Sequence, residues 1–214
     1  MSFRDALKGY LINPEKYSED IIFHDKDVVI VKDRFPKSLC HLLVLPRDLQ
    51  LSKSKPWALN AEVKAKLEPY IEMALNYVFK TFTKEYELKE EVKVMPFYTK
   101  AQFHNRDYFI ENFTQVGIHI VPSMNNLHVH VMTKDFHSER LKNKKHYNSF
   151  TTEFFVLWDR LPLQNVDSKH MEDTVIKKSD LKCCFCKANF KNRFSELKLH
   201  LDHEFGKRFV ECSI

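Results

Sequence analysis

The sequence predicts an α+β protein in which an antiparallel sheet packs against helices and is followed by a small C-terminal module. Three observations support this fold class. Short apolar segments with strand-like alternation recur along the chain, one long segment has helical periodicity, and three of the five cysteines lie between Cys183 and Cys186. A chain of 214 residues has room for one domain with a sizeable core and one small additional unit.

The N-terminal half contains the first predicted elements. Residues 2–11 form a short helix, with apolar side chains at helical spacing and Asn13-Pro14 after its end. Residues 27–32 and 40–46 form two strands joined by a polar turn at 33–37. Residues 63–82 form a long amphipathic helix that bends or begins near Pro69.

The second half contains a predicted hairpin and a separate module. No regular structure is predicted for residues 87–113. Residues 115–121 and 127–133 form a hairpin, and residues 154–158 form a further short strand. We therefore expect one domain over residues 1–165, a polar linker over 166–180 and a small module over 181–214.

Composition excludes several classes of protein. With only three glycines, the chain contains neither a glycine-rich phosphate loop nor a dinucleotide fingerprint. Its apolar segments are far shorter than the ~20 residues of a membrane-spanning helix, so no membrane partner is expected. The net charge of +5 permits a polyanionic partner. The odd, clustered cysteines favour a metal site in a reducing compartment over a disulfide framework.

Strand alternation in the hairpin directs several histidines to one face of the sheet. Leu127, Val129 and Val131 face the core, whereas His128 and His130 face the other way. On the facing strand the same alternation leaves His119 on that second face, and His41 begins another apolar strand. Spacing alone leaves open a polar surface, a catalytic cluster and a metal site with His119 as third ligand.

A wider pattern around these histidines resembles the histidine-triad superfamily of nucleotide hydrolases and transferases. It consists of Gly-Ile-His at 117–119, Pro-Ser-Met at 122–124 and the alternating histidines, with Asp-Arg-Phe-Pro-Lys at 33–37 and His-Leu-Leu-Val-Leu-Pro at 41–46 upstream. Together with the cysteine module, it is most similar to the aprataxins, a family of DNA-adenylate hydrolases. One position departs from the family pattern of three alternating histidines, because the first is Asn126.

The resemblance implies a reaction and a role for each matching residue. His128 attacks the α-phosphorus of an adenylate on a DNA 5′ end, and water then cleaves the covalent AMP–histidine. His130 binds the phosphate, His119 is the general acid, and Ser123 hydrogen-bonds the phosphate. Asn126 can still orient a neighbour through hydrogen bonds, although it does not titrate near neutrality. No catalytic metal is implied, and the activity extends to 3′-guanylated DNA ends.

Further positions match family residues that bind the nucleotide and the DNA. Asp33 binds the ribose hydroxyls, Lys37 and His41 lie toward the DNA phosphate, Phe3 is a wedge against the terminal base pair, and Leu7 faces the adenine. Simpler roles remain open for three of them. Asp33 is a residue type that favours turns. Lys37 could simply be solvated, and Phe3 could simply anchor its helix to the core.

The C-terminal module has the spacing of a zinc finger. Cys183 and Cys186 are spaced Cys-x2-Cys, and His200 follows on a helical segment. Glu204 and His203 both lie about one helical turn beyond His200, and we prefer Glu204 because some aprataxins show His-x3-Glu. The ion would be a structural Zn²⁺, since so small a module needs a metal to fold. The alternative is a helical tail without zinc.

Two basic segments flank the predicted nucleotide site. Lys142 and Lys144 belong to the run at 140–145, and Lys191 and Arg193 belong to the finger. Either they are ordinary solvated residues or they bind the phosphate backbone of nicked or end-damaged DNA, without regard to base sequence.

Three functions follow from these patterns. The first is the aprataxin reaction, with AMP as product. The second is hydrolysis of free dinucleotides or nucleoside phosphoramidates by a general histidine-triad enzyme. The third is non-catalytic binding of DNA ends by a protein whose triad has decayed at Asn126. We expect a monomer in the nucleus, with a cytoplasmic location as the alternative.

Overall fold

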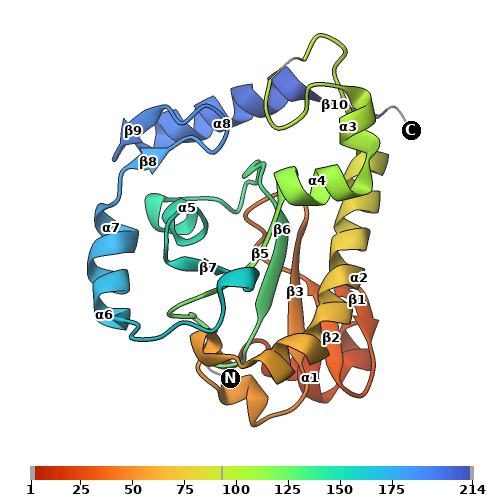
Figure 1. Ribbon diagram of the computed structural model, residues 1–214, viewed down its shortest axis with the longest axis vertical. Helices are drawn as coiled ribbons and strands as arrows, with labels where there is room; N and C mark the ends of the chain where they lie inside the picture. The colour runs from red at the N-terminus through yellow and green to blue at the C-terminus, as the bar shows by residue number, and fades with distance from the viewer. Residues whose placement is uncertain (1–2, 93, 213–214) are drawn as a thin grey trace.

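The computed structural model describes residues 3–92 and 94–212, apart from the side chains of Phe3 and Lys53. Its centre is a six-stranded antiparallel sheet with the order β1-β2-β3-β6-β5-β7 (Figure 1). The strands are β1 (Ile21–His24), β2 (Val28–Lys32), β3 (His41–Pro46), β5 (Thr114–His119), β6 (Val129–Thr133) and β7 (Phe155–Leu157). All except β1 were predicted. The predicted hairpin is formed by β5 and β6, which pair antiparallel with Gly117 opposite His130.

One face of the sheet is covered by the long helix α2 (Ala61–Glu85). Asn60 caps the helix by accepting a hydrogen bond from the Val63 amide at 2.9 Å. The predicted apolar stripe of α2, including Leu67 and Val78, packs in one core cluster with Val129 and Val131 of β6. The predicted amphipathic helix is therefore confirmed, with Pro69 inside it.

Residues 87–113 contain regular elements, contrary to the sequence prediction. They contribute to β4 (Tyr86–Leu88), α3 (Lys100–His104) and α4 (Arg106–Phe113). Both helices are too short to show a clear apolar period, but each has a capping residue, Thr99 and Asn105. Their phenylalanines join the main core.

The N-terminal segment covers one half of the face opposite α2. The single helix predicted over 2–11 is wrong, because the described part forms a 3-10 turn, η1 (Phe3–Asp5), and a short helix, α1 (Lys8–Ile12). Position 2, the predicted cap, lies outside the described residues. Leu7 and Tyr10 pack against Val31 and Leu43 of the sheet. The Asn125 amide donates to the Arg4 carbonyl at 2.7 Å, which ties this segment to the turn before His128.

The other half of that face is covered by α5 (Lys144–Thr151) and the C-terminal finger. The finger consists of β8 (Leu181–Lys182), β9 (Asn189–Lys191) and α8 (Phe194–Arg208). Its Leu197 and Leu201 share a core cluster with Phe150 of α5. A last strand, β10 (Phe209–Glu211), pairs with β4 and so attaches the end of the finger to the part of the chain that contains the main sheet.

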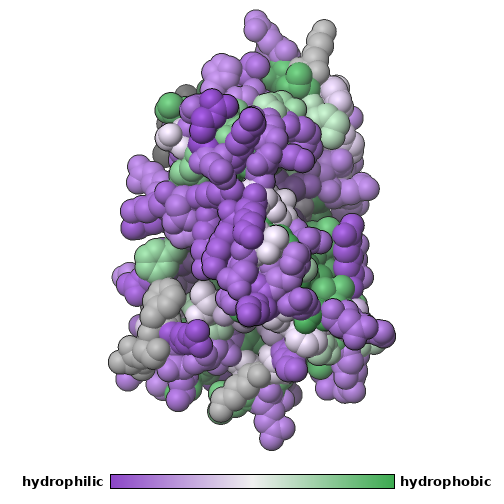
Figure 2. Space-filling view, turned by 90° about the vertical axis from the view of Figure 1, so that its left-hand side faces the viewer, coloured by the Kyte–Doolittle hydropathy of each residue, from purple (hydrophilic) through white to green (hydrophobic). Residues whose placement is uncertain are grey.

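The segment expected to be a polar linker is helical. Residues 168–178 consist of α6 (Ser168–His170), a π-helical turn at Met171–Val175 and α7 (Ile176–Lys178). Val175 and Ile176 are buried with Phe154, which explains why the segment is ordered despite its polarity. This side of the molecule is predominantly hydrophilic (Figure 2). Among the helices of the described chain, none has the length and apolarity required to cross a membrane.

Candidate active site and zinc site

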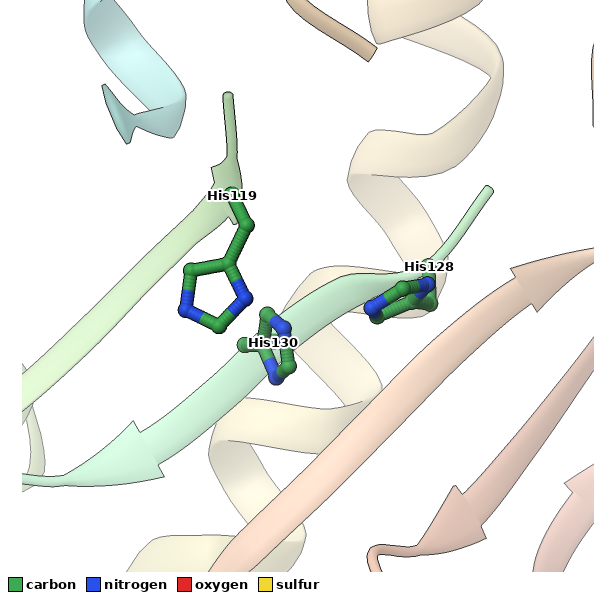
Figure 3. Close-up of side chains that lie close together, drawn as sticks. All are labelled: His119, His128 and His130. Carbon is green, nitrogen blue, oxygen red and sulfur yellow. The ribbon is translucent and has the colours of Figure 1, made fainter. Parts of the chain in front are cut away.

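Four histidines from three adjacent strands meet on the face opposite α2. His130 lies on β6 and His128 directly before it, His119 ends β5 and His41 begins β3. The ring centroid of His130 is 4.6 Å from that of His119, 4.9 Å from that of His128 and 5.1 Å from that of His41. His130 therefore lies between His119 and His128 (Figure 3). The convergence predicted from strand alternation is confirmed.

Hydrogen bonds define which nitrogen of His130 carries its proton. The Lys37 amide donates to Nδ1 of His41 at 3.1 Å, so the proton of neutral His41 is on Nε2. That Nε2 lies 2.9 Å from Nδ1 of His130 and donates to it. Neutral His130 therefore carries its proton on Nε2, which is buried and has no partner within the described part of the chain. This N–H is available to a ligand.

His128 is arranged as a nucleophile. Its Nδ1 lies 2.7 Å from the main-chain carbonyl of Asn126 and donates a proton to it. The lone pair is then on Nε2. Burial lowers the pKa of His128, although the Asn126 carbonyl and Asp33 act in the opposite direction, so the ring is neutral at pH 7. A neutral imidazole with a fixed proton can attack an electrophile such as phosphorus.

His119 is enclosed by aromatic rings. Its ring centroid lies 4.5 Å from that of Phe150 and 5.5 Å from that of Phe154. Its Nε2 is buried without a partner among the described residues. Burial, together with the neighbouring histidines, holds the pKa of His119 well below its usual value. A bound phosphate would raise this pKa, because an anion stabilises the imidazolium.

The turn at 33–37 lies beside the histidines. Asp33 accepts a hydrogen bond from the Phe35 amide at 2.8 Å, and its other carboxylate oxygen lies 3.6 Å from Nε2 of His41. The ammonium of Lys37 donates to the Phe35 carbonyl. Burial lowers the pKa of Lys37, which Asp33 partly offsets. His41, which is expected to lie toward the DNA phosphate, is fully buried, and both of its ring nitrogens form hydrogen bonds within the protein.

The other predicted nucleotide-binding residues differ in exposure. Ser123 is exposed in the turn before His128, and Asn126 is buried. Leu7 is buried in the cluster against which Met124 packs. The side chain of Phe3, the predicted DNA wedge, lies outside the described residues.

The sequence did not reveal Phe150, which contacts three of the histidines. Its ring centroid is 4.5 Å from that of His119, 5.0 Å from that of His130 and 5.4 Å from that of His41. It lies on α5, which was not predicted. The signal that could have found this helix is Asn143, which caps it by accepting from the His146 amide at 2.9 Å.

Cys183, Cys186 and His200 form a second cluster, with ligand atoms within 4.8 Å of one another. Sγ of Cys186 lies 3.1 Å from Nε2 of His200, and the Phe185 amide donates to Sγ of Cys183 at 3.4 Å. Two thiolates and one imidazole are a donor set suited to zinc. Of the two candidates for a fourth ligand, Glu204 is buried and His203 is exposed. Here the Glu204 carboxylate pairs with Arg208 at 2.6 Å.

The predicted basic residues lie at the surface. Lys142, Lys191 and Arg193 are exposed, and Arg193 pairs with Glu196 at 3.1 Å. The ammonium of Lys144, on α5, donates to Asn192 of the finger. The basic run at 140–145 and the finger are therefore in direct contact.

A neutral histidine nucleophile beside two further imidazoles, on an antiparallel sheet, defines the histidine-triad class of nucleotide hydrolases. Models of known families match both the domain with the main sheet and the C-terminal finger. Residues 9–146 match the family described as scavenger mRNA decapping enzyme C-term binding, and residues 151–207 match the C2HE / C2H2 / C2HC zinc-binding finger.

Two aprataxin-like proteins and one solved structure align with nearly the whole chain. It is 47% identical to an aprataxin-like protein of Saccharomyces cerevisiae, covering 98% of this chain and 99% of that protein. It is 37% identical to an aprataxin-like protein of Schizosaccharomyces pombe, covering 95% and 82%. A solved structure of the aprataxin ortholog Hnt3 in complex with DNA aligns with a TM-score of 0.67 at 36% identity, covering 95% and 94%. The chain belongs to the aprataxin family and is a DNA-end repair hydrolase with a zinc-binding finger.

Proposed function

We propose that this chain removes AMP from 5′-adenylated DNA ends, the products of abortive ligation, through a covalent AMP–histidine on His128. The observation that carries this proposal is the hydrogen bond from Nδ1 of His128 to the Asn126 carbonyl, which leaves Nε2 free to attack. Beside it, the unpartnered Nε2–H of His130 offers a neutral donor for a phosphate oxygen.

The first step replaces a phosphoanhydride bond by a phosphorus–nitrogen bond. Nε2 of His128 attacks the α-phosphorus of the adenylate, and the 5′-phosphate of the DNA departs. The attacking ring becomes cationic, and the Asn126 carbonyl stabilises it by accepting from Nδ1–H. Nε2–H of His130 donates to a non-bridging oxygen. His119, protonated when the anionic substrate is bound, gives its proton to the leaving oxygen.

The second step releases AMP. Water attacks the same phosphorus, His119 takes its proton, and the phosphorus–nitrogen bond breaks to restore neutral His128. Two displacements at one histidine replace a single direct hydrolysis, which is the advantage of covalent catalysis.

The finger fits the role of a DNA-binding platform held at a fixed place. Cys183, Cys186 and His200, with Glu204 as the proposed fourth ligand, would hold Zn²⁺, which neutralises the thiolates and joins the turn after β8 to α8. The ring of His137, which follows β6, stacks on Phe205 of α8 with centroids 4.2 Å apart. Nδ1 of His137 also lies 2.9 Å from Asp202. The basic residues of the finger are thus kept beside the catalytic half.

The substrate range, assembly and location are parts of the same proposal. One Hnt3 structure is described as a complex with DNA and guanosine, which supports action on 3′-guanylated ends as well. We propose that the protein works as a monomer in the nucleus, without a catalytic metal. Sedimentation and imaging of the tagged protein test the first two points, and turnover in a chelator that spares the finger tests the third.

A nicked duplex with a 5′-AMP cap tests the proposed function. The wild-type protein is expected to release AMP, whereas His128→Ala is expected to bind the nick without turnover. Equal rates on adenylated DNA and on free diadenosine polyphosphates would instead indicate a general dinucleotide hydrolase. Tight binding to the nick with no turnover by the wild type would indicate a non-catalytic end-binding protein.

A further inference from the structure

The amide of Asn126, which occupies the first triad position, is held by one residue far away in the sequence. Nδ2 of Asn126 donates to Oγ of Ser52 at 2.8 Å, and both side chains are buried. Oδ1 of Asn126 is buried too, and among the described residues it has no hydrogen-bond partner. Ser52 is therefore the one hydrogen-bonding contact that the described structure gives this amide.

Ser52 also holds the main chain next to the nucleophile. The Leu127 amide donates to the Ser52 carbonyl at 2.7 Å. That amide and the Asn126 carbonyl belong to the same peptide unit, which is planar and rigid. The carbonyl at its other edge accepts from Nδ1 of His128 at 2.7 Å. Ser52 and His128 thus bind opposite edges of one peptide plane.

The position of Ser52 is itself fixed by a turn. Ser52 lies in the 3-10 turn η3 (Leu51–Lys53), and its amide donates to the Asp48 carbonyl at 2.7 Å. The Asp48 carboxylate accepts from the amides of Gln50 and Leu51 at 2.8 and 3.2 Å. A continuous series of hydrogen bonds therefore leads from the turn at 48–52 to His128.

We propose that Ser52 is a positioning residue for His128 and that it acts through Asn126. By holding the amide of Asn126 and the adjoining peptide plane, Ser52 aims the carbonyl that retains the proton on Nδ1 of His128. When the hydroxyl is removed, the Asn126 side chain loses this hydrogen bond, and Ser52 holds the adjoining peptide plane only through its carbonyl. The carbonyl of Asn126 is then aimed less firmly and the proton can occupy Nε2, where it abolishes the attacking lone pair. The kinetic consequence rests on the proposed function, but the consequence for the tautomer does not.

Kinetic variants test whether Ser52 acts through Asn126. In single turnover, Ser52→Ala and Asn126→Ala should each slow formation of the AMP–protein adduct about tenfold at saturation. The protein concentration that gives half of the maximal rate should change little. The double variant should be no slower than either single one, because both break the same connection. Ser54→Ala is the matched control, since Ser54 is exposed in the same segment and, among the described residues, its hydroxyl bonds the Leu51 carbonyl alone. Its rate should equal that of the wild type.

Histidine nitrogen NMR tests the same proposal without substrate. The spectrum of protein labelled with 15N-histidine, with His128 assigned by comparison with His128→Ala, should show His128 protonated on Nδ1 in the wild type and in Ser54→Ala. Ser52→Ala should shift this signal toward a mixture of tautomers, and Asn126→Ala should do the same. An unchanged tautomer in a folded Ser52→Ala protein would overturn the proposal, as would additive rate losses in the double variant. If the wild type released no AMP, the proposed function would fail, and the NMR comparison would still decide the role of Ser52.

Discussion

Nε2 of His41 donates to Nδ1 of His130 at 2.9 Å, and this bond determines that neutral His130 carries its proton on the other ring nitrogen, Nε2. The bond depends in turn on the Lys37 amide, which occupies Nδ1 of His41. A donor that is aligned before the substrate arrives needs no reorganisation in the transition state, which is the basis of electrostatic catalysis. In the proposed mechanism, His41 therefore supports catalysis from a fully buried position.

Replacement of His41 by alanine should therefore reduce kcat at least tenfold, because His130 is then free to place its proton on either nitrogen. His41→Gln should retain part of the activity, since its amide can still donate to Nδ1 of His130. Steady-state rates of AMP release measure both effects. His24→Ala, at an exposed position on β1, is the control. If His41→Ala retained the full kcat, the proposed alignment of His130 would be incorrect.

The free energy of unfolding should decrease as the pH falls below 6.5. Burial lowers the pKa of His41 from 6.5 to about 4, so between these values the unfolded chain binds a proton that the folded protein does not. The full contribution is present above pH 6.5, and this residue alone loses about 3 kcal/mol by pH 4. Urea unfolding at several pH values should show a shallower decrease in His41→Gln. Parallel curves for the two proteins would contradict this account of His41.

Binding to nicked DNA should depend on salt through the two basic segments. Lys142→Ala and Lys191→Ala should each weaken binding to any DNA sequence and reduce the slope of log Kd against log salt concentration by about one, as expected for one lost phosphate contact. Fluorescence anisotropy over a range of salt concentrations measures this slope. Lys80→Ala, exposed on α2, should leave the slope unchanged. A normal slope in both test variants would remove these lysines from the DNA path.

Zinc affinity should distinguish Glu204 from His203. Glu204→Ala should weaken zinc binding at least tenfold, because Glu204 is the buried candidate on the inner side of α8. His203→Ala, at an exposed position, should bind zinc like the wild type. Competition with a chromophoric chelator provides the affinities. The reverse ranking of the two variants would assign the fourth ligand to His203.

Much of the fold followed from local patterns in the sequence. Alternation and helical periodicity predicted five strands of the main sheet and α2, because a half-buried strand and an amphipathic helix each repeat with a fixed period. The short helices α3, α4 and α5 have too few turns for such a period, and only their capping residues mark them. The sequence predicts a linker over residues 166–180 because the two residues that are buried there, Val175 and Ile176, leave no visible pattern.

Some residues of the candidate site could be predicted from the sequence, and the contacts of others could not. His119, His128 and His130 were predicted from alternation on paired strands, and Cys183, Cys186 and His200 from ligand spacing. The contacts of His41, Phe150 and Ser52 depend on tertiary packing between segments far apart in the sequence, as in the pair Ser52 and Asn126. No local pattern contains that information, so these supporting roles required the folded structure.

The most direct test of the central claim is to trap the covalent intermediate. The wild-type protein is mixed with 5′-adenylated nicked DNA, quenched in base to preserve the acid-labile phosphorus–nitrogen bond, and digested for mass spectrometry. We predict an AMP adduct on the peptide that contains His128, located at that residue by fragmentation and absent from His128→Ala. Rapid AMP release by His128→Ala, or an adduct on another histidine, would contradict the mechanism.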